Sequence, residues 1–249
     1  QQKLSDINGS FKIKKLDLRV EEIVPAPVTE HYRNRMDFVI DRQGAMGLRE
    51  KGKWWRVIDD HPCFLADANI EKLFTITRDW VKTSGLSFYD RKANVGLLRY
   101  AVIRSTTLGQ TMLTIVTSAP KDTDEEAAAK LAFAKLNELA GPTTLVWSIN
   151  HTISDVSFGD ELRVLHGPGT IEEHIGGYKY RLSPNAFFQT NPTCAAFLLD
   201  TVREFARGDN DDSGDRTGQS PVPTGKLLDL YCGTGFFGVA MANDFAKTI

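Results

Sequence analysis

A glycine-rich segment near the carboxyl end of the chain has the composition of a ligand-binding loop. Residues 229–235 read DLYCGTG, and the apolar residues around them predict a strand, a turn and a helix. Because glycine has no Cβ, a ligand can come close to the backbone N–H groups of such a turn. The same pattern also serves to pack a helix tightly on a strand, and it matches neither Gly-x-Gly-x-x-Gly nor a P-loop. The turn alone therefore predicts the opening of a nucleotide-type α/β domain and leaves its ligand open.

A second segment places paired aromatic residues beside amides. Residues 183–191 read SPNAFFQTN, in which Phe187 and Phe188 stand directly before Gln189 and a predicted helix. One interpretation is structural: the rings form a buried wedge, and the TN pair caps the helix. Considered together with the glycine-rich turn, the segment becomes a candidate part of a binding site.

A third candidate is a basic stretch with two adjacent tryptophans. Residues 33–56 carry seven Lys or Arg against three Asp or Glu, and the stretch includes Trp54 and Trp55. Cations position a protein on phosphates, and aromatic rings stack on unpaired bases. The alternative is an ordinary solvated hairpin whose two tryptophans lie in the core. The sequence leaves both open.

Hydrophobic periodicity predicts the elements that must position these segments. We expect helices at 1–18, 67–84, 121–139 and 191–205, and strands at 35–41, 46–50, 54–58, 95–105, 109–117 and 145–150, with short strands over 158–181. Residues 207–221 are polar, acidic and rich in Gly, which predicts a disordered surface loop. The predicted domains are an entry helix and linker (1–28), a central α+β domain (29–182) and the incomplete start of an α/β Rossmann-like domain (183–249).

Composition narrows the class of protein. The formal net charge of -2 excludes a uniformly basic surface, and 41% hydrophobic residues are enough for a packed core. Three widely spaced cysteines, Cys63, Cys194 and Cys232, argue against a disulfide framework. We expect a cytoplasmic monomer. Because the chain begins with Gln and ends soon after the glycine-rich turn, we also expect a piece of a larger enzyme, truncated at both ends.

The three segments together resemble the RNA (uracil-5-)-methyltransferase family, which methylates C5 of uridines in tRNA and 23S rRNA. The resemblance rests on HYRNRMDF at 31–38 with GLR at 47–49, on SPNAFFQTN at 183–191 and on DLYCGTG at 229–235. Their order and spacing cover nearly the whole chain. The resemblance implies a class I, S-adenosylmethionine-dependent enzyme with RNA as its partner and RNA binding by the central domain.

By this resemblance, the residues that contact S-adenosylmethionine are Gln189, Tyr231, Gly233 and Gly235. Phe236 replaces the Asn that often follows, so a polar contact from that position is not expected. The family's nucleophilic Cys and its base are expected beyond Ile249, and the chain itself should then contain no catalytic residue and be inactive.

The resemblance also bears on Cys63. Many family members hold a 4Fe-4S cluster on four cysteines, and Cys63 matches the fourth, with the other three expected before residue 1. The alternative is a buried apolar cysteine. Two further functions stay open: a non-catalytic RNA-binding module derived from such an enzyme, and an unrelated small-molecule methyltransferase in which the basic hairpin is incidental. The intact glycine-rich turn and Gln189 favour the enzyme over the binding module.

Overall fold

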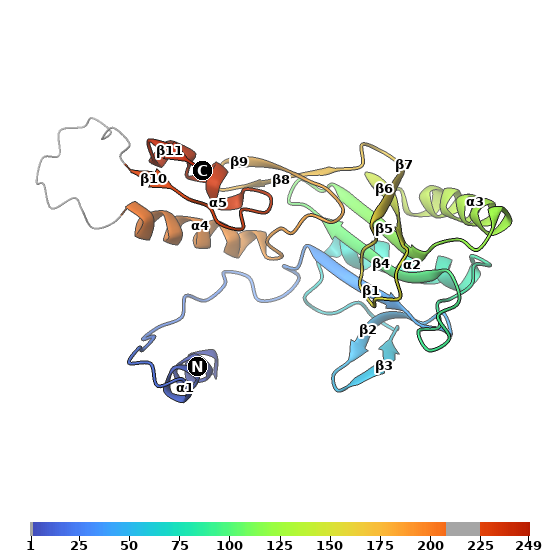
Figure 1. The fold of residues 1–249 in the computed structure, drawn as a ribbon, viewed down its shortest axis with the longest axis horizontal. Coiled ribbons are helices and arrows are strands. Elements are labelled where there is room, and N and C mark those ends of the chain that lie inside the picture. Colours follow the sequence, from blue (N-terminus) through green and yellow to red (C-terminus); the bar gives the residue numbers. More distant parts are fainter. Residues whose placement is uncertain (1, 208–224) are drawn as a thin grey trace, which may run out of the picture.

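A computed structural model describes residues 2–207 and 225–249 of the chain (Figure 1). In chain order the elements are α1 (Gln2–Ile13), β1 (Arg35–Ile40), β2 (Met46–Glu50), β3 (Lys53–Ile58), α2 (Ala68–Thr83), β4 (Leu98–Ser105), β5 (Thr111–Ser118), α3 (Thr123–Ala140), β6 (Thr144–Asn150), β7 (Glu161–His166), β8 (Ile171–Ile175), β9 (Tyr178–Leu182), α4 (Pro192–Arg207), β10 (Lys226–Leu227), α5 (Phe236–Ala240), the 3-10 helix η1 (Ala242–Asp244) and β11 (Lys247–Thr248). The loop predicted to be disordered, 207–221, lies outside the described residues except for its first residue.

Seven strands form one sheet in the order β3-β2-β1-β4-β5-β6-β7. Neighbouring strands are antiparallel except β5 and β6, which run parallel because α3 carries the chain across between them. Helices α2 and α3 pack on one face of this sheet and share its main hydrophobic core (Figure 1). This part of the chain combines a mostly antiparallel sheet with two helices, and the central domain with the bounds 29–182 stays a prediction.

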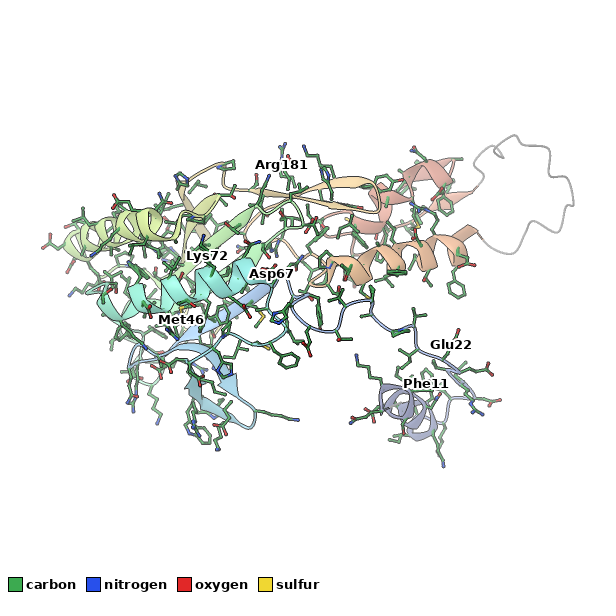
Figure 2. The ribbon with its side chains drawn as sticks, turned by 180° about the vertical axis from the view of Figure 1, so that it is seen from behind. Phe11, Glu22, Met46, Asp67, Lys72 and Arg181 are labelled. Atoms are coloured by element: carbon green, nitrogen blue, oxygen red, sulfur yellow. The ribbon has the colours of Figure 1, made fainter. Side chains whose placement is uncertain are left out.

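Local capping explains where the two covering helices begin and end. The carboxylate of Asp67, labelled at the start of α2 in Figure 2, accepts a hydrogen bond of 2.9 Å from the backbone N–H of Ile70. Asp122 caps α3 in the same way, with 2.8 Å to the N–H of Glu125. Gly141 ends α3 in the left-handed conformation, at φ 54°, which glycine adopts without strain.

The carboxyl-terminal third of the chain builds a second, smaller core. Strands β8 and β9 form a sheet of their own and pack with α4 and α5 rather than extending the large sheet (Figure 1). Strand β10 pairs in parallel with β11 through two residues each. Packing thus groups residues 171–182 with the segment that follows them. The domain boundary expected after residue 182 stays a prediction.

The amino-terminal helix is present but ends earlier than expected, at Ile13 rather than near residue 18. Helix α1 has no buried residue, and Figure 2 shows it with Phe11 apart from the large sheet. The side chain of Asn8 exchanges two hydrogen bonds of 2.9 Å with the backbone of Val20, so the linker folds back onto its helix. Among the described residues, no helix is long and apolar enough to cross a membrane.

Candidate cofactor motif and nucleic-acid interface

Backbone carbonyl groups of the segment 183–191 accept hydrogen bonds that attach the segment to the end of the large sheet. The guanidinium Nη2 of Arg104, on β4, donates a hydrogen bond of 2.6 Å to the carbonyl oxygen of Ala186. The backbone N–H of Asn34, just before β1, donates to the carbonyl oxygen of Thr190 at 3.0 Å. These bonds set the path of the chain on both sides of Phe188 and Gln189.

Arg104 is a buried charge that lies near another cation, Arg35, and an anion, Asp37. Only 3% of the residue is exposed. Burial, followed by repulsion from Arg35, lowers the pKa of Arg104 to about 10, and attraction to Asp37 offsets part of this. Its Nη1 has no hydrogen-bond partner among the described residues. A buried guanidinium with a free donor is costly, so the bond to Ala186 is an important part of what satisfies it.

An aromatic cluster joins the two motifs that lie far apart in the sequence. Phe188 packs edge-on against Phe236, with ring centroids 5.6 Å apart and an interplanar angle of 88°. Tyr180, on β9, contacts both rings and donates its hydroxyl to the carbonyl oxygen of Phe236 at 3.0 Å. The wedge interpretation holds for Phe188, which is 4% exposed, and is wrong for Phe187, which is 72% exposed.

Burial gives Phe236 a structural role at the position where the family often has Asn. Its side chain is 5% exposed and forms part of the second core. The buried ring holds the start of α5 against β9 and the segment 183–191.

The glycine-rich turn is largely open to solvent, and it adopts left-handed backbone conformations that suit glycine and are uncommon for tyrosine. Tyr231, Gly233 and Gly235 all have positive φ, at 64°, 55° and 75°. Tyr231 is fully exposed. A Cβ added at Gly233 would meet no atom closer than 3.9 Å, so a ligand can approach the turn there. Asp229 closes the turn by accepting the N–H of Gly238 at 2.9 Å.

The predicted cofactor residues stand on both sides of the aromatic cluster. Gln189 directly follows Phe188 and is half-buried, whereas Gly235 directly precedes Phe236. The packing of the two phenylalanines thus brings the backbones of both motifs together. That Gln189, Tyr231, Gly233 and Gly235 contact a cofactor stays a prediction.

The cysteines do not form a metal site within the described residues. Cys63 is a free thiol packed partly against the main core, and Cys194 is partly buried on α4. No group of three His, Cys, Asp or Glu side chains in the described ranges could hold a metal ion. The residues present therefore do not fit a 4Fe-4S cluster without further ligands.

The basic stretch contains exposed tryptophans, so the alternative of two core tryptophans is wrong. Trp54 is 54% and Trp55 63% exposed on β3, which is the edge strand of the large sheet. Arg91 and Lys92, which were not among the predicted residues, line the same cavity as the tryptophans although they lie outside residues 33–56. The adjacent pair of cations was the available signal.

Proteins of similar sequence carry RNA methyltransferase names, in agreement with the family that these motifs indicate. No protein-family model matches the chain. It is 32% identical over 246 residues to a tRNA (uracil(54)-C(5))-methyltransferase of Pyrococcus furiosus, which covers 96% of this chain and 51% of the relative. It is also 32% identical over 229 residues to an uncharacterized RNA methyltransferase of Caldanaerobacter subterraneus, covering 90% of this chain and 48% of that protein.

A solved structure matches as well. The crystal structure of Pyrococcus abyssi tRNA (uracil-54, C5)-methyltransferase in complex with S-adenosyl-L-homocysteine superposes with a TM-score of 0.67 at 27% identity, over 93% of this chain and 50% of that one. The chain thus spans about half the length of the proteins it matches. The resemblance to the RNA (uracil-5-)-methyltransferases is confirmed, and a methyltransferase fold is supported over that half. The Rossmann-like character of residues 183–249 stays a prediction.

Proposed function

We propose that this chain belongs to an RNA (uracil-5-)-methyltransferase, and that the whole protein transfers a methyl group from S-adenosylmethionine to C5 of a uridine in tRNA or 23S rRNA. In this proposal the large sheet with α2 and α3 belongs to the RNA-binding part. Residues 183–249 contribute the first elements of the cofactor site. Its monomeric state and cytoplasmic location are part of the same proposal.

The observation that carries the proposal is the contact of Phe188 with Phe236. It joins the segment SPNAFFQTN to the turn DLYCGTG, the two motifs on which the family resemblance rests. If the two segments served only to pack a helix on a strand, the aromatic cluster would not need an amide side chain and an open glycine-rich turn beside it. Relatives that carry the methyltransferase name over the same residues add independent support.

The residues proposed to hold the cofactor fit its chemistry. S-adenosylmethionine supplies an electrophilic methyl group on a sulfonium when it is bound. The open backbone at Gly233 gives its methionine end access to N–H donors, and the amide of Gln189 offers a donor and an acceptor. At Gly235 an added Cβ would lie 3.1 Å from the side chain of Val239, so the absence of a side chain there relieves a close contact. The exposed ring of Tyr231 provides a surface on which the cofactor can lie.

The remaining chemistry needs groups that we do not assign to this chain. C5 of uracil is a weak nucleophile, and addition of a cysteine thiolate at C6 makes C5 an enolate carbon that can attack the methyl group. A base then removes the C5 proton, and the thiolate leaves. Cys194 packs on α4 and Cys232 belongs to the turn, so we assign the nucleophile to neither.

Methyl transfer by the whole protein from S-adenosylmethionine carrying a tritiated methyl group tests the function. We expect label in a tRNA or a 23S rRNA transcript, released as tritiated water when the substrate is instead labelled at uridine C5. The transcript that accepts the methyl group identifies the RNA. If the whole protein binds RNA but transfers no label to any transcript, the methyltransferase proposal fails and the non-catalytic binding module is supported. The chain alone, to which no nucleophile is assigned, should transfer no label.

Equilibrium binding of S-adenosylhomocysteine tests the cofactor residues separately. We expect Gln189→Ala and Tyr231→Ala each to raise the Kd by about tenfold, and Tyr231→Phe to raise it less, because phenylalanine keeps the ring. Unchanged thermal unfolding of each variant shows that the fold is intact. An unchanged Kd in all three variants would remove this site assignment and leave the transfer reaction untouched.

A further inference from the structure

A cavity of about 520 Å³ opens beside the exposed tryptophans, which is within the range of small-ligand sites. It lies between the turn that follows β1, strand β3 and residues 89–92, and Arg49 of β2 also lines it. We call this cavity the tryptophan groove. Figure 1 shows that β2 and β3 project from the edge of the large sheet, away from α4 and α5. The groove is therefore separate from the glycine-rich turn.

The two tryptophans differ in what covers their rings. The guanidinium of Arg91 lies 5.2 Å from the centroid of Trp54, in a cation–π contact. Trp55 meets Trp54 in an edge-to-face arrangement at 5.8 Å and 89°. Because Trp55 has no cation over its ring in the described structure and is 63% exposed, it offers a free aromatic face to a ligand.

Cations dominate the lining of the groove. The basic side chains are Arg42, Arg49, Arg56, Arg91 and Lys92, against the carboxylates of Asp41 and Asp90. Two further carboxylates neutralise part of this charge from beside the groove: Asp155 pairs with Arg49 and Arg91, and Glu50 pairs with Arg56. With these pairs counted, the groove keeps an excess of positive charge, although the net charge of the whole chain is -2.

Both carboxylates that line the groove accept hydrogen bonds from backbone N–H groups of their own turns. Asp41 accepts the backbone N–H groups of Gln43 and Ala45 at 2.8 and 2.9 Å. Asp90 accepts the N–H of Lys92 at 2.8 Å, and this bond is the main reason why its pKa is lowered. Arg42 approaches Asp90 only to 3.7 Å. The ammonium of Lys92 has no ion pair within the described part of the chain, so it can bind an anion.

We propose that the tryptophan groove binds an unpaired base of the RNA, stacked on Trp55, with the neighbouring phosphates held by Lys92 and Arg42. Stacking on an aromatic ring suits any exposed base, and cations beside the ring neutralise the backbone that carries it. Arg91 acts as a positioning residue, because it holds the ring of Trp54 and thereby the edge on which Trp55 rests. The proposal rests on the proposed function for its choice of RNA as the ligand.

The charge of the groove favours RNA over a protein strand added to the edge strand β3. Lys53 and Arg56 stand on β3 itself, and charged residues on an edge strand oppose pairing with another strand. A base with its phosphates instead uses both features of the groove, the free ring and the cations.

Tryptophan fluorescence provides a direct readout. The chain has four tryptophans, and Trp80 and Trp147 are buried at 2% and 0% exposure, so a ligand in the groove acts on Trp54 and Trp55 alone. Titration with single-stranded oligouridylate should quench their emission, and a blunt RNA duplex of equal length should quench it much less. Equal quenching by the duplex would overturn the stacking proposal.

Two variants with matched controls test the contacts. Trp55→Ala should weaken binding of the single-stranded RNA at least about fivefold, as loss of one stacked base does. Phe205→Ala, which removes an even more exposed aromatic ring from α4 (83% against 63%), should leave it unchanged. For RNA binding, Lys92→Gln should reduce the slope of the logarithm of the association constant against the logarithm of the salt concentration by about one. Lys135→Gln on α3 should leave this slope unchanged.

The outcomes separate this proposal from the proposed function. If the Trp55→Ala variant transfers methyl groups with an unchanged KM for RNA, the proposal that the groove binds a base is wrong and the proposed methyltransferase function still stands. Weaker RNA binding by Trp55→Ala in a protein that transfers no methyl group would support the groove and reject the enzyme. If Trp55→Ala changes the oligomeric state and not RNA binding, β3 is a protein interface and the groove proposal is wrong.

Discussion

Phe188 and Phe236 meet edge-to-face at 5.6 Å, although Phe188 belongs to the segment 183–191 and Phe236 directly follows the turn 229–235. Tyr180 completes the cluster from β9, with ring centroids 5.2 and 5.6 Å from the two phenylalanines. Each phenylalanine is adjacent in sequence to a proposed cofactor residue. Packing and cofactor binding should therefore be coupled at this cluster.

Replacing Phe236 by Ala tests that coupling. We expect a loss of about 3 to 5 kcal/mol in the free energy of unfolding, because the ring is buried and its removal leaves a cavity. Binding of S-adenosylhomocysteine should weaken in parallel. Urea unfolding followed by circular dichroism measures the first effect. Phe197→Ala, which removes a half-exposed ring from α4, should cost less than about 1 kcal/mol; equal losses would contradict the cluster's role.

Arg104→Met separates positioning from stability. The variant removes the 2.6 Å bond to Ala186, and we expect the Kd for S-adenosylhomocysteine to rise by about tenfold. The free energy of unfolding should change by less than about 1 kcal/mol, because a costly buried charge is removed as well. Calorimetry and urea unfolding measure the two quantities. The control is Arg99→Met on the same strand, whose guanidinium bonds Thr152 and Ser154 instead and whose loss should not affect the cofactor.

Asp37 gives the protein a dependence on acid pH. Burial alone would raise the pKa of Asp37, but hydrogen bonds from Arg35 and Ser157 and the charges of Arg35 and Arg104 lower it overall. The ionised form is therefore favoured by folding. Its stabilisation is fully present above the unfolded pKa of about 3.9 and is lost as pH falls through the lower folded value.

Asp37→Asn should accordingly lower the free energy of unfolding by about 1 to 3 kcal/mol at pH 7. The difference from the wild type should shrink at an acid pH below the unfolded pKa of about 3.9, as Asp37 takes up a proton in the folded protein too. Unfolding in urea at the two pH values measures it. The exposed Asp6→Asn on α1 serves as control and should change neither value; a pH-independent deficit in Asp37→Asn would show that charge is not the cause.

Tyr100 predicts a loss of stability at alkaline pH. Burial, and then the hydrogen bond of 2.6 Å to Asp155, raise the pKa of Tyr100 to about 12. Between about pH 10 and 12 the unfolded chain releases a proton that the folded protein keeps, so stability falls as pH rises. Tyr100→Phe should lose less stability than the wild type between pH 9 and pH 11. Equal losses would mean that the phenol titrates normally in the fold.

Local signals were sufficient for the helices and most strands. Asp67, Asp122 and Gly141 act on backbone groups within four residues, so the bounds of α2 and α3 followed from the sequence to within a few positions. The alternation of β1 and β2 predicted their hairpin for the same reason. The motifs themselves, and the family they indicate, are also properties of the linear chain.

Side-chain burial at sheet edges and between distant motifs could not be predicted in this way. Trp54 and Trp55 are exposed because β3 is the last strand of its sheet, and strand order depends on pairing with β2 across the whole fold. Phe187 and Phe188 look equivalent in sequence, yet only Phe188 meets the ring of Phe236.

The sequence by itself determined the elements, the three motifs and the chemistry they suggest, because these depend on residue types and short spacings. Only the tertiary structure decided which of these residues meet. It placed Arg91 over Trp54, buried Phe236 against Tyr180 and aimed Arg104 at Ala186, contacts that join residues far apart along the chain. Such contacts depend on how the packed sheet and helices bring distant segments together.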